Sequence, residues 1–371
     1  MPRFIAFYLP QYHPIPENDR WWGKDFTEWT NVVKGIPLFE GHYQPHVPAD
    51  LGYYDLCDPV VRERQAELAR AYGVYGFCYY YYWFNGKRLL ETPLNEVLRL
   101  SQPDFPFCVC WANEPWTRNW DGKHTEILMP QEHTNETDER FILDLLPVLR
   151  DERYIRINGR PLVLIYRTEL LPDIRRTALV WREVASKNNI DLYLCRVESF
   201  AREDLASINF DASCEFPPNI SGILPGDTSK MSFGPDAFEG NLYDYRKLVE
   251  LMLHRPDAPY RRFRGVTPSW DNTARMRSRA SVFLNSSPDL FRHWLTEVTR
   301  RTVTTLQGEE QIVFINAWNE WAEGCHLEPD RRYGRAYLEA CKAALEATLY
   351  VQAHAESAGS RAFEDFQFNS V

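Results

Sequence analysis

The sequence has no excess of basic residues: 42 Lys and Arg stand against 52 Asp and Glu, which gives a net charge of −10. A nucleic-acid partner needs a basic surface that neutralises phosphates, so this class of partner is not expected. The sequence also has no glycine-rich phosphate loop and no Asp-x-Asp motif. Nucleotide donors are commonly held by such a loop, or by a metal on such a motif, so these absences argue against a nucleotide site.

The eight cysteines form no CxxC pair and show no Cys/His spacing typical of a metal site. His42 and His46 are four residues apart, but Pro45 and Pro48 forbid the helix that would align them, and no third ligand is evident. We therefore expect no metal, no cofactor and no disulfide framework, in a cytoplasmic protein. No apolar stretch reaches the length of a membrane span, and residues 1–4 lead directly into a strand, so we expect neither membrane insertion nor a signal peptide.

Short apolar runs alternate with helical segments along the chain. The expected strands are residues 4–9, 74–82, 107–111, 161–166, 192–197, 211–215, 264–268 and 311–316. This count and order predict an α/β fold, a (β/α)8 TIM barrel with long loops, as one domain over residues 1–350. A doubly wound sheet is the alternative, and the missing glycine-rich first turn disfavours it. Residues 351–371 are small and polar, and we expect a flexible tail there.

Polar and aromatic residues gather just after the expected strands, where such barrels place their active sites. Aromatic residues make up 14% of the chain, and such rings stack on the C–H faces of sugars. The candidates for binding an oligosaccharide or polysaccharide are Tyr8, Gln11, His13, Trp29, Asn31, His46, Tyr81, Trp83, Trp111, Asn113, Glu114, Trp116, Trp270, Asp271, Trp318 and Asn319. The tryptophans could equally pack loops, and the run Tyr79–Tyr82 alternates, so two of its tyrosines face the barrel and two face the helices.

Glu320 and Glu323 follow the last expected strand and are the candidate catalytic residues. If residues 319–324 form one helical or 3₁₀ turn, positions i and i+3 project to the same side. Two carboxylates that lie so close repel each other, which raises the pKa of one of them. The pair then provides one acid and one base at neutral pH. Spacing alone does not order the two roles. The alternative is a helix start at which Asn319 is the cap and both glutamates favour the dipole.

Glu114 is a rival catalytic residue. An Asn-Glu pair at the end of a strand recurs in barrel glycosidases as the general acid/base, but that pattern follows strand four, whereas Glu114 follows the third expected strand. Otherwise Glu114 binds substrate hydroxyls or an arginine such as Arg118.

Six motifs resemble the WbsX family, and the match extends over about residues 4–345. They are Phe7–Asn18, Gly23–Asn31, His42–His46, Gly76–Phe84, Trp111–Trp116 and Asn316–Gly324. This family is associated with O-antigen and lipopolysaccharide gene clusters and is often labelled glycosyltransferase. It is also similar to the (β/α)8 glycoside hydrolase family 99, the endo-α-mannosidases.

The resemblance to family 99 implies a role for each glutamate in the Trp-Asn-Glu-Trp-x-Glu-Gly motif. Glu320 would deprotonate the sugar 2-hydroxyl, which attacks the anomeric carbon and gives an epoxide-like intermediate with overall retention. Glu323 would be the general acid and then the base that activates water or an acceptor. The implied activity is hydrolysis or transglycosylation of a bacterial surface polysaccharide. The alternatives are a glycosyltransferase of O-antigen or lipopolysaccharide synthesis and a non-catalytic glycan-binding barrel, which would not need an acid/base pair.

Overall fold

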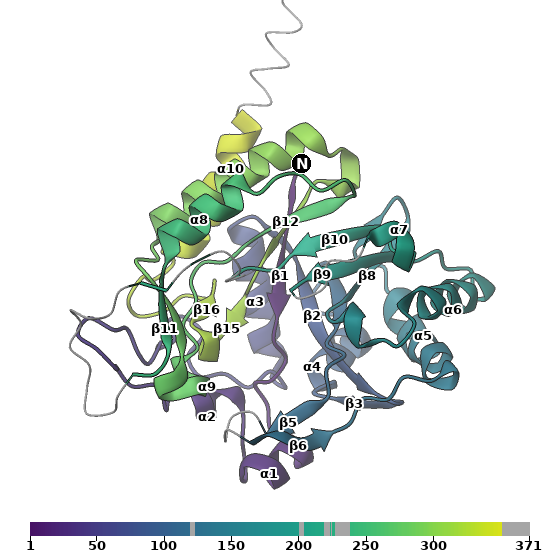
Figure 1. Cartoon of the computed structure of the whole chain (residues 1–371), viewed down its shortest axis with the longest axis horizontal. Helices are drawn as coiled ribbons and strands as arrows, with labels where there is room; N and C mark the ends of the chain where they lie inside the picture. The colour runs from purple at the N-terminus through teal and green to yellow at the C-terminus, as the bar shows by residue number, and fades with distance from the viewer. Residues whose placement is uncertain (119–122, 200–203, 219–222, 224, 227–237, 351–371) are drawn as a thin grey trace, which may run out of the picture.

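The computed structural model describes residues 1–118, 123–199, 204–218, 223, 225–226 and 238–350 (Figure 1). Eight parallel strands form a closed barrel, because β1 pairs with both the second and the last strand of the set. These strands are β1 (Arg3–Tyr8), β2 (Val74–Phe84), β4 (Phe107–Trp111), β8 (Arg160–Ile165), β9 (Tyr193–Glu198), β10 (Ala212–Glu215), β12 (Arg262–Val266) and β14 (Ile312–Ile315). They are the eight strands expected from the sequence, so the (β/α)8 prediction is confirmed.

The barrel strands are buried on both faces, which explains why their sequences are continuous apolar runs without alternation. All residues of β1, β4 and β14 are buried. The same is true of the five apolar residues that end β8. This burial places the core of the domain inside the barrel and between the barrel and its helices.

Helices cover the outside of the barrel between the strands. They are α3 (Pro59–Ala71), α4 (Thr92–Leu100), α5 (Asn135–Leu149), α6 (Ile174–Lys187), α7 (Leu205–Ile208), α8 (Tyr245–His254), α10 (Pro288–Thr305) and a last helix over residues 336–350. α5 and α6 lie side by side on one flank, and α8 and α10 on another (Figure 1). Local sequence sets several helix starts. Asp58 and Ser287 accept hydrogen bonds from backbone N–H groups in the first turns of α3 and α10, and a proline follows each cap.

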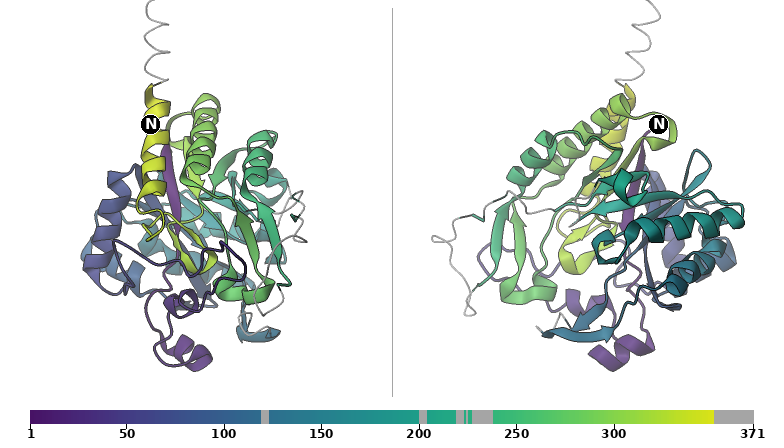
Figure 2. Two further views of the ribbon diagram at one scale, coloured as in Figure 1. Left: turned by 90° about the vertical axis from the view of Figure 1, so that its left-hand side faces the viewer. Right: turned by 45° about the vertical axis from the view of Figure 1, so that its right-hand side comes forward.

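Short elements crowd the carboxyl end of the barrel, which is the lower end in Figures 1 and 2, opposite the N-terminus. They are α1 (Pro16–Trp22), α2 (Glu28–Val32), β5 (Trp116–Arg118), β6 (Lys123–Met129), α9 (Thr273–Met276), β15 (Asn319–Glu320), η5 (Trp321–Glu323) and β16 (Cys325–His326). The remaining strands are β3 (Lys87–Leu89), β7 (Arg156–Ile157), β11 (Asn241–Asp244) and β13 (Ser281–Leu284). The long segment after β1 contributes α1 and α2 to this end.

The eight cysteines all lie among the described residues and are unpaired. Within the described part of the chain, no helix is both long and apolar enough to cross a lipid bilayer. The tail expected over residues 351–371 lies outside the described residues.

Candidate active site

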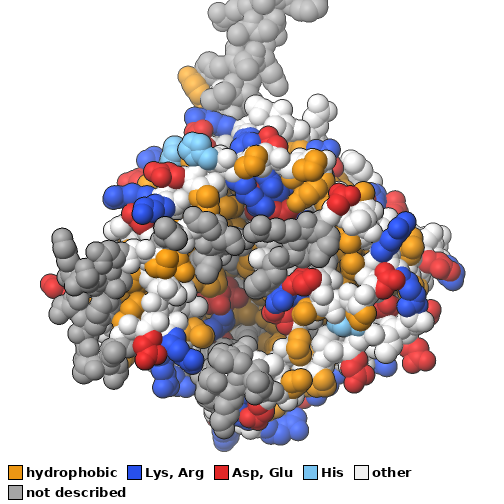
Figure 3. All heavy atoms as spheres, viewed as in Figure 1, with side chains coloured by type: hydrophobic (Ala, Val, Ile, Leu, Met, Phe, Trp, Pro, Cys, Tyr) orange, Lys and Arg blue, Asp and Glu red, His pale blue; other side chains and the backbone are white. Residues whose placement is uncertain are grey.

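A cavity of about 290 Å³ opens at the carboxyl end of the barrel, and Figure 3 shows this face hollowed, with acidic side chains in the hollow. The segments after β1, β4, β10, β12 and β14 all contribute to its wall. The polar and aromatic lining residues are Gln11, Trp22, Tyr80, Tyr82, Glu114, Trp116, Thr117, Tyr166, Phe216, Trp270, Arg275, Glu320 and Glu323. The cavity therefore lies where a (β/α)8 barrel places its catalytic residues.

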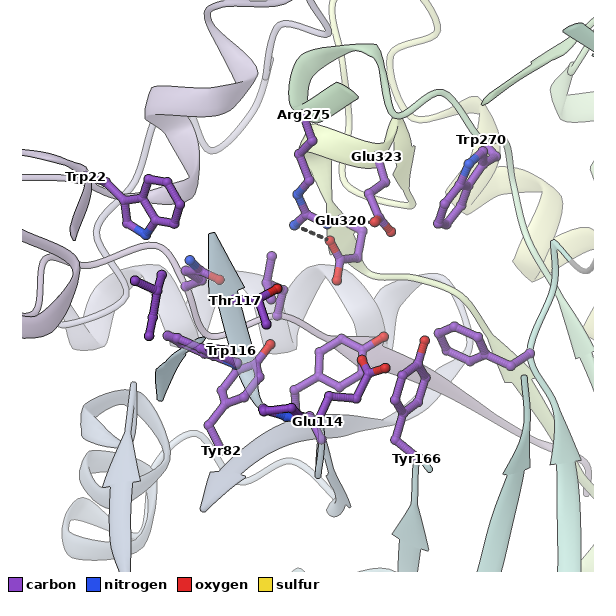
Figure 4. A pocket seen from close by; sticks show the side chains of 17 residues that line it. Trp22, Tyr82, Glu114, Trp116, Thr117, Tyr166, Trp270, Arg275, Glu320 and Glu323 are labelled. Carbon is purple, nitrogen blue, oxygen red and sulfur yellow. Dashed lines mark hydrogen bonds and ion pairs between the residues drawn. The ribbon is translucent and has the colours of Figure 1, made fainter. Parts of the chain in front are cut away.

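Glu320 and Glu323 project into this cavity from the segment that follows β14 (Figure 4). Glu320 ends β15, and the 3₁₀ turn η5 ends at Glu323, so the predicted turn forms and brings positions i and i+3 to one side. The side chain of Glu320 is 6% exposed and that of Glu323 is 21% exposed. The pair therefore faces the cavity from a largely buried position.

Asn319 does not cap this turn, so the alternative that made Asn319 the cap is wrong. Its side chain accepts a hydrogen bond from the backbone N–H of Leu9 at 2.8 Å and donates to the carbonyl of the same residue at 3.0 Å. These two bonds fasten the end of β1 to the segment that carries both glutamates. Asn319 is fully buried and lies outside the cavity lining.

Arg275, on α9, joins the two glutamates to a third carboxylate. Its Nη1 donates to Oε1 of Glu323 at 2.6 Å, and its Nη2 donates to Oε2 of Glu320 at 3.1 Å. Its Nε donates to Oε1 of Glu28 at 2.7 Å, and Glu28 is fully buried in α2. One guanidinium thus bonds to three carboxylates, an arrangement that its planar fork of donors permits.

The electrostatics of the pair favour retention of a proton. Burial raises the pKa of Glu320 to about 8, and the nearby Glu323 and Glu28 add to the shift while Arg275 opposes it. Burial also raises the pKa of Glu323 above its usual range, again against the effect of Arg275. Burial is thus the first cause, and the like charge expected from the sequence adds to it. At neutral pH the pair can offer one protonated and one ionised carboxyl group.

Aromatic rings flank the carboxylates at both ends of the cavity. Trp22 and Trp116 lie at one end and Trp270 at the other, with Tyr82 and Tyr166 along the wall that faces the glutamates (Figure 4). Rings in these places can stack on the faces of sugar units on either side of Glu320 and Glu323, which we call the acid pair.

Glu114 lies on the wall opposite the acid pair, after the third barrel strand as counted from the sequence. It forms an ion pair with Arg167, whereas Arg118, the partner considered from the sequence, pairs with Glu126 at 3.0 Å. Burial raises the pKa of Glu114 and Arg167 opposes this shift. Asn113 holds the backbone of Arg167 with two 2.8 Å hydrogen bonds and does not line the cavity. Glu114 is therefore an ion-paired carboxylate in the wall of the cavity.

The two tryptophans on either side of Glu320, Trp318 and Trp321, do not line the cavity. Trp318 and Trp321 donate their indole N–H groups to the buried Glu328 at 2.9 and 2.7 Å. Tyr54 and Gln65 donate to the same carboxylate at 2.8 and 2.7 Å. A buried carboxylate with four donors holds these rings in fixed positions, so Trp318 supports the segment that carries Glu320 and Glu323.

Four further residues expected to bind substrate face the helical layer. Tyr8 donates to Gln65, Trp83 donates to Asp144, Trp111 stacks on Phe141, and Tyr81 lies under the guanidinium of Arg88. The reason is the strand period of two, because a side chain one position away from an inward residue points outward. Of the four consecutive tyrosines in β2, Tyr80 and Tyr82 line the cavity and Tyr79 and Tyr81 do not.

The remaining expected residues hold the loops around the cavity. His13 bonds to the carbonyl of Pro10, Trp29 to that of Tyr54, and Asn31 to Glu28. His46 bonds to His326, and Asp271 accepts hydrogen bonds from His42 and Gln44. Of the residues expected from the sequence, the structure brings together Gln11, Glu114, Trp116, Trp270, Glu320 and Glu323.

Several lining residues were not expected. Tyr80 and Tyr82 could have been found by fixing which face of β2 points inward, and Tyr166 by its place at the end of β8. Trp22 and Arg275 lie on short helices inside loops, and no motif marks them in the sequence.

Comparisons with known proteins give a family and a fold. Residues 4–341 match the family model described as Glycosyltransferase WbsX. The uncharacterized protein WxcX from two strains of Xanthomonas campestris pv. campestris is 46% identical over 342 residues. These residues are 92% of this chain but 49% of WxcX, so the chain spans about half the length of the curated relatives it matches.

Solved structures share the fold at low sequence identity. The GH99 endo-alpha-mannosidase from Bacteroides thetaiotaomicron superposes with a TM-score of 0.58 and 13% identity, over 95% of this chain and 98% of that one. A glycoside hydrolase-like protein gives a TM-score of 0.58 and 15% identity, over 92% and 93% of the two chains. At such identities the likeness shows the fold alone, and function has to be argued from the site.

Proposed function

The chain belongs to the WbsX glycosyltransferase family, and on this premise we propose that it cleaves or transfers glycosidic bonds of a bacterial surface polysaccharide. The family and the fold point to a carbohydrate-active enzyme. The observation that carries the finer proposal is the pair Glu320 and Glu323, which share one cavity and one arginine.

The proposed reaction has two halves and needs one proton on the pair at the start. Glu320 takes the proton of the substrate 2-hydroxyl, and that oxygen forms a bond to the anomeric carbon. The bond from this carbon to the leaving oxygen breaks, and Glu323 gives its proton to the leaving group. In the second half, Glu323 takes a proton from water or from an acceptor hydroxyl, whose oxygen opens the epoxide-like ring while Glu320 returns its proton. Two inversions give retention, without a covalent bond to the enzyme.

Arg275 suits this exchange, because one negative charge moves from Glu320 to Glu323 in the first half and returns in the second. The guanidinium contacts both carboxylates, so the moving charge stays beside the same cation. A fixed cation in a buried site lowers the energy of such a transfer without reorganisation of solvent. The pKa of both groups is raised, so the coupled pair keeps one proton near neutral pH, and the reaction starts from the state in which this proton lies on Glu323 and Glu320 is ionised.

The rest of the lining provides the contacts that a glycan needs. We propose that Trp22, Trp116 and Trp270 stack on sugar units at the two ends of the cavity. Gln11 and Glu114 offer polar groups to sugar hydroxyls from the side walls.

A second candidate function is sugar transfer from a nucleotide donor, and the description of the family favours it. Against it, the sequence has no glycine-rich phosphate loop and no Asp-x-Asp motif. Transfer from a glycoside donor would satisfy both the description of the family and the acid pair.

The experiment that separates these functions uses surface polysaccharide from the bacterium that encodes the chain. The protein is incubated with this glycan, with and without nucleotide sugars, and the products are analysed by mass spectrometry. Our proposal predicts shorter or rearranged glycans in both samples. A mass gain that requires a nucleotide sugar would support the second candidate instead.

A further inference from the structure

A cluster of metal-binding side chains lies beside the acid pair, in a region that the proposed reaction does not use. It consists of His46, from the long segment after β1, and of His326 and Asp330, from the segment after β14. We propose that these three residues form a binding site for a divalent transition-metal cation of the Zn²⁺ class. Two histidines and one carboxylate are a common set of ligands for such ions.

The positions of the three ligand atoms fit one ion. Nδ1 of His46 lies 2.9 Å from Nε2 of His326, and that nitrogen lies 4.0 Å from Oδ2 of Asp330. All three atoms lie within 4.8 Å of one another. A cation with bonds of about 2.1 Å sets its ligand atoms roughly 3.0 to 3.4 Å apart. Movements of a few tenths of an ångström at the histidines and somewhat more at Asp330 would complete the set.

The hydrogen bonds around the cluster leave the required lone pairs in place. Nδ1 of His326 lies 2.9 Å from the carbonyl of Glu328 and must donate to it, so Nε2 carries a lone pair toward His46. A backbone carbonyl behind the second ring nitrogen is the usual support of a metal-binding histidine. Oδ1 of Asp330 accepts the backbone N–H of Tyr333 at 2.6 Å, which leaves Oδ2 on the side of the histidines. The cation would replace the proton between the two rings, and that proton would move to Nε2 of His46.

Aromatic contacts hold both imidazoles in orientation. The ring of Tyr43 stacks on His46 with centroids 4.4 Å apart, and the ring of Trp321 stacks on His326 at 3.7 Å. His46, His326 and Asp330 are 7%, 3% and 3% exposed, so the cluster is preorganised within the fold. His42 takes no part, because it bonds to Asp271 at 2.7 Å.

A second cavity, of about 310 Å³, gives access to the cluster and room for a further ligand of the ion. All three residues line it, and it shares Trp270 with the cavity of the acid pair. Trp321, which stacks on His326, is the residue directly after Glu320. A bound cation would therefore join the segment after β1 to the back of the turn that carries both glutamates.

The test uses the full chain without an affinity tag, stripped with a chelator and then titrated with Zn²⁺ or Co²⁺ and no sugar. We expect one ion per chain by calorimetry, a Co²⁺ absorption spectrum of low coordination number, and a rise in Tm of about 2–6 °C. Asp330→Asn and His326→Gln should each weaken binding about 10- to 100-fold. His293→Gln, on the exposed face of α10, should bind as the parent does.

Two results would overturn the proposal. One is the absence of binding to the parent chain at about 100 μM Zn²⁺, a concentration far above the Kd of protein zinc sites. The other is equal binding by the parent and by both ligand variants, which would assign the ion to other histidines. The spectrum of the parent decides the question even if a variant does not fold. Because no sugar is present, the outcome does not depend on the proposed reaction.

Discussion

Nη1 of Arg275 lies 2.6 Å from Oε1 of Glu323, and this ion pair joins the loop after β12 to the loop after β14. The same guanidinium bonds to Glu320 and to Glu28, so it is the cation that allows three carboxylates to be buried together. Its own side chain is 15% exposed. The acid pair, its proton and its orientation all depend on this residue.

Replacement of Arg275 by methionine should therefore reduce both stability and activity. Removal of one partner of a buried ion pair commonly costs about 3–5 kcal/mol, because it leaves buried charge without compensation. Urea denaturation and the kcat/KM for a cleaved glycan measure the two effects. Arg279→Met, on the exposed part of the neighbouring turn, is the matched control and should change neither. A variant of Arg275 with the stability of the parent would contradict the role given to this residue.

Glu323→Gln should remove the general acid. We expect kcat/KM to fall by about 10²- to 10⁴-fold for a substrate with a poor leaving group. An activated aryl glycoside should lose much less, because its leaving group needs no proton. Rates on both substrates, with the exposed Glu339→Gln as a control, decide the point. Equal losses on the two substrates would show that Glu323 is not the acid.

Two tryptophans should respond in opposite ways to substitution. Trp270→Ala removes a ring of the cavity wall, so KM should rise while the free energy of unfolding changes little. Trp318→Phe removes a donor from the buried Glu328, so the free energy of unfolding should fall by about 1–3 kcal/mol with little change in KM. If Trp318→Phe instead raised KM without loss of stability, the result would support the direct contact between Trp318 and a sugar that was expected from the sequence.

The acid pair should make stability depend on pH. Burial raises the pKa of Glu320 to about 8 in the folded protein, whereas an unfolded glutamate titrates near 4.3. The folded state therefore binds more protons between about pH 4.3 and pH 8, and the free energy of unfolding falls as pH rises through this window.

Glu320→Gln removes this contribution. Between pH 5 and pH 8 the free energy of unfolding of the variant should therefore fall by about 1–3 kcal/mol less than that of the parent. Glu328, whose pKa burial raises to about 7, keeps part of the dependence in both proteins. Denaturation at several pH values measures the difference. Parallel curves for parent and variant would mean that Glu320 titrates normally.

The sequence was sufficient to predict the barrel, because each barrel strand is a short apolar run that is buried on both faces. It was also sufficient to predict that Glu320 and Glu323 lie on one side of a turn after the last strand, because a single 3₁₀ turn joins them. Local spacing fixes both features, so no knowledge of distant contacts was needed.

The walls of the cavity could be predicted only in part. Tyr81 was predicted to bind substrate, but its neighbours Tyr80 and Tyr82 line the cavity instead. The prediction was wrong by one position, and in a strand a shift of one position moves a side chain to the opposite face. Arg275 could not be found, because its partner Glu28 is 247 residues away in the chain. Trp318 stands in the motif beside Glu320, but the acceptor that turns its ring away comes ten residues later.

The central step of the proposed reaction is the action of Glu320 through the 2-hydroxyl of the substrate. The direct measurement compares the cleaved glycan with its 2-deoxy analogue, with all other positions kept. A 2-deoxy sugar ionises more readily, so acid catalysis by Glu323 alone would still cleave it. We predict no turnover of the analogue above the rate of the Glu320→Gln, Glu323→Gln double variant. Turnover of the analogue by the parent at a rate near that of the natural glycan would contradict the account.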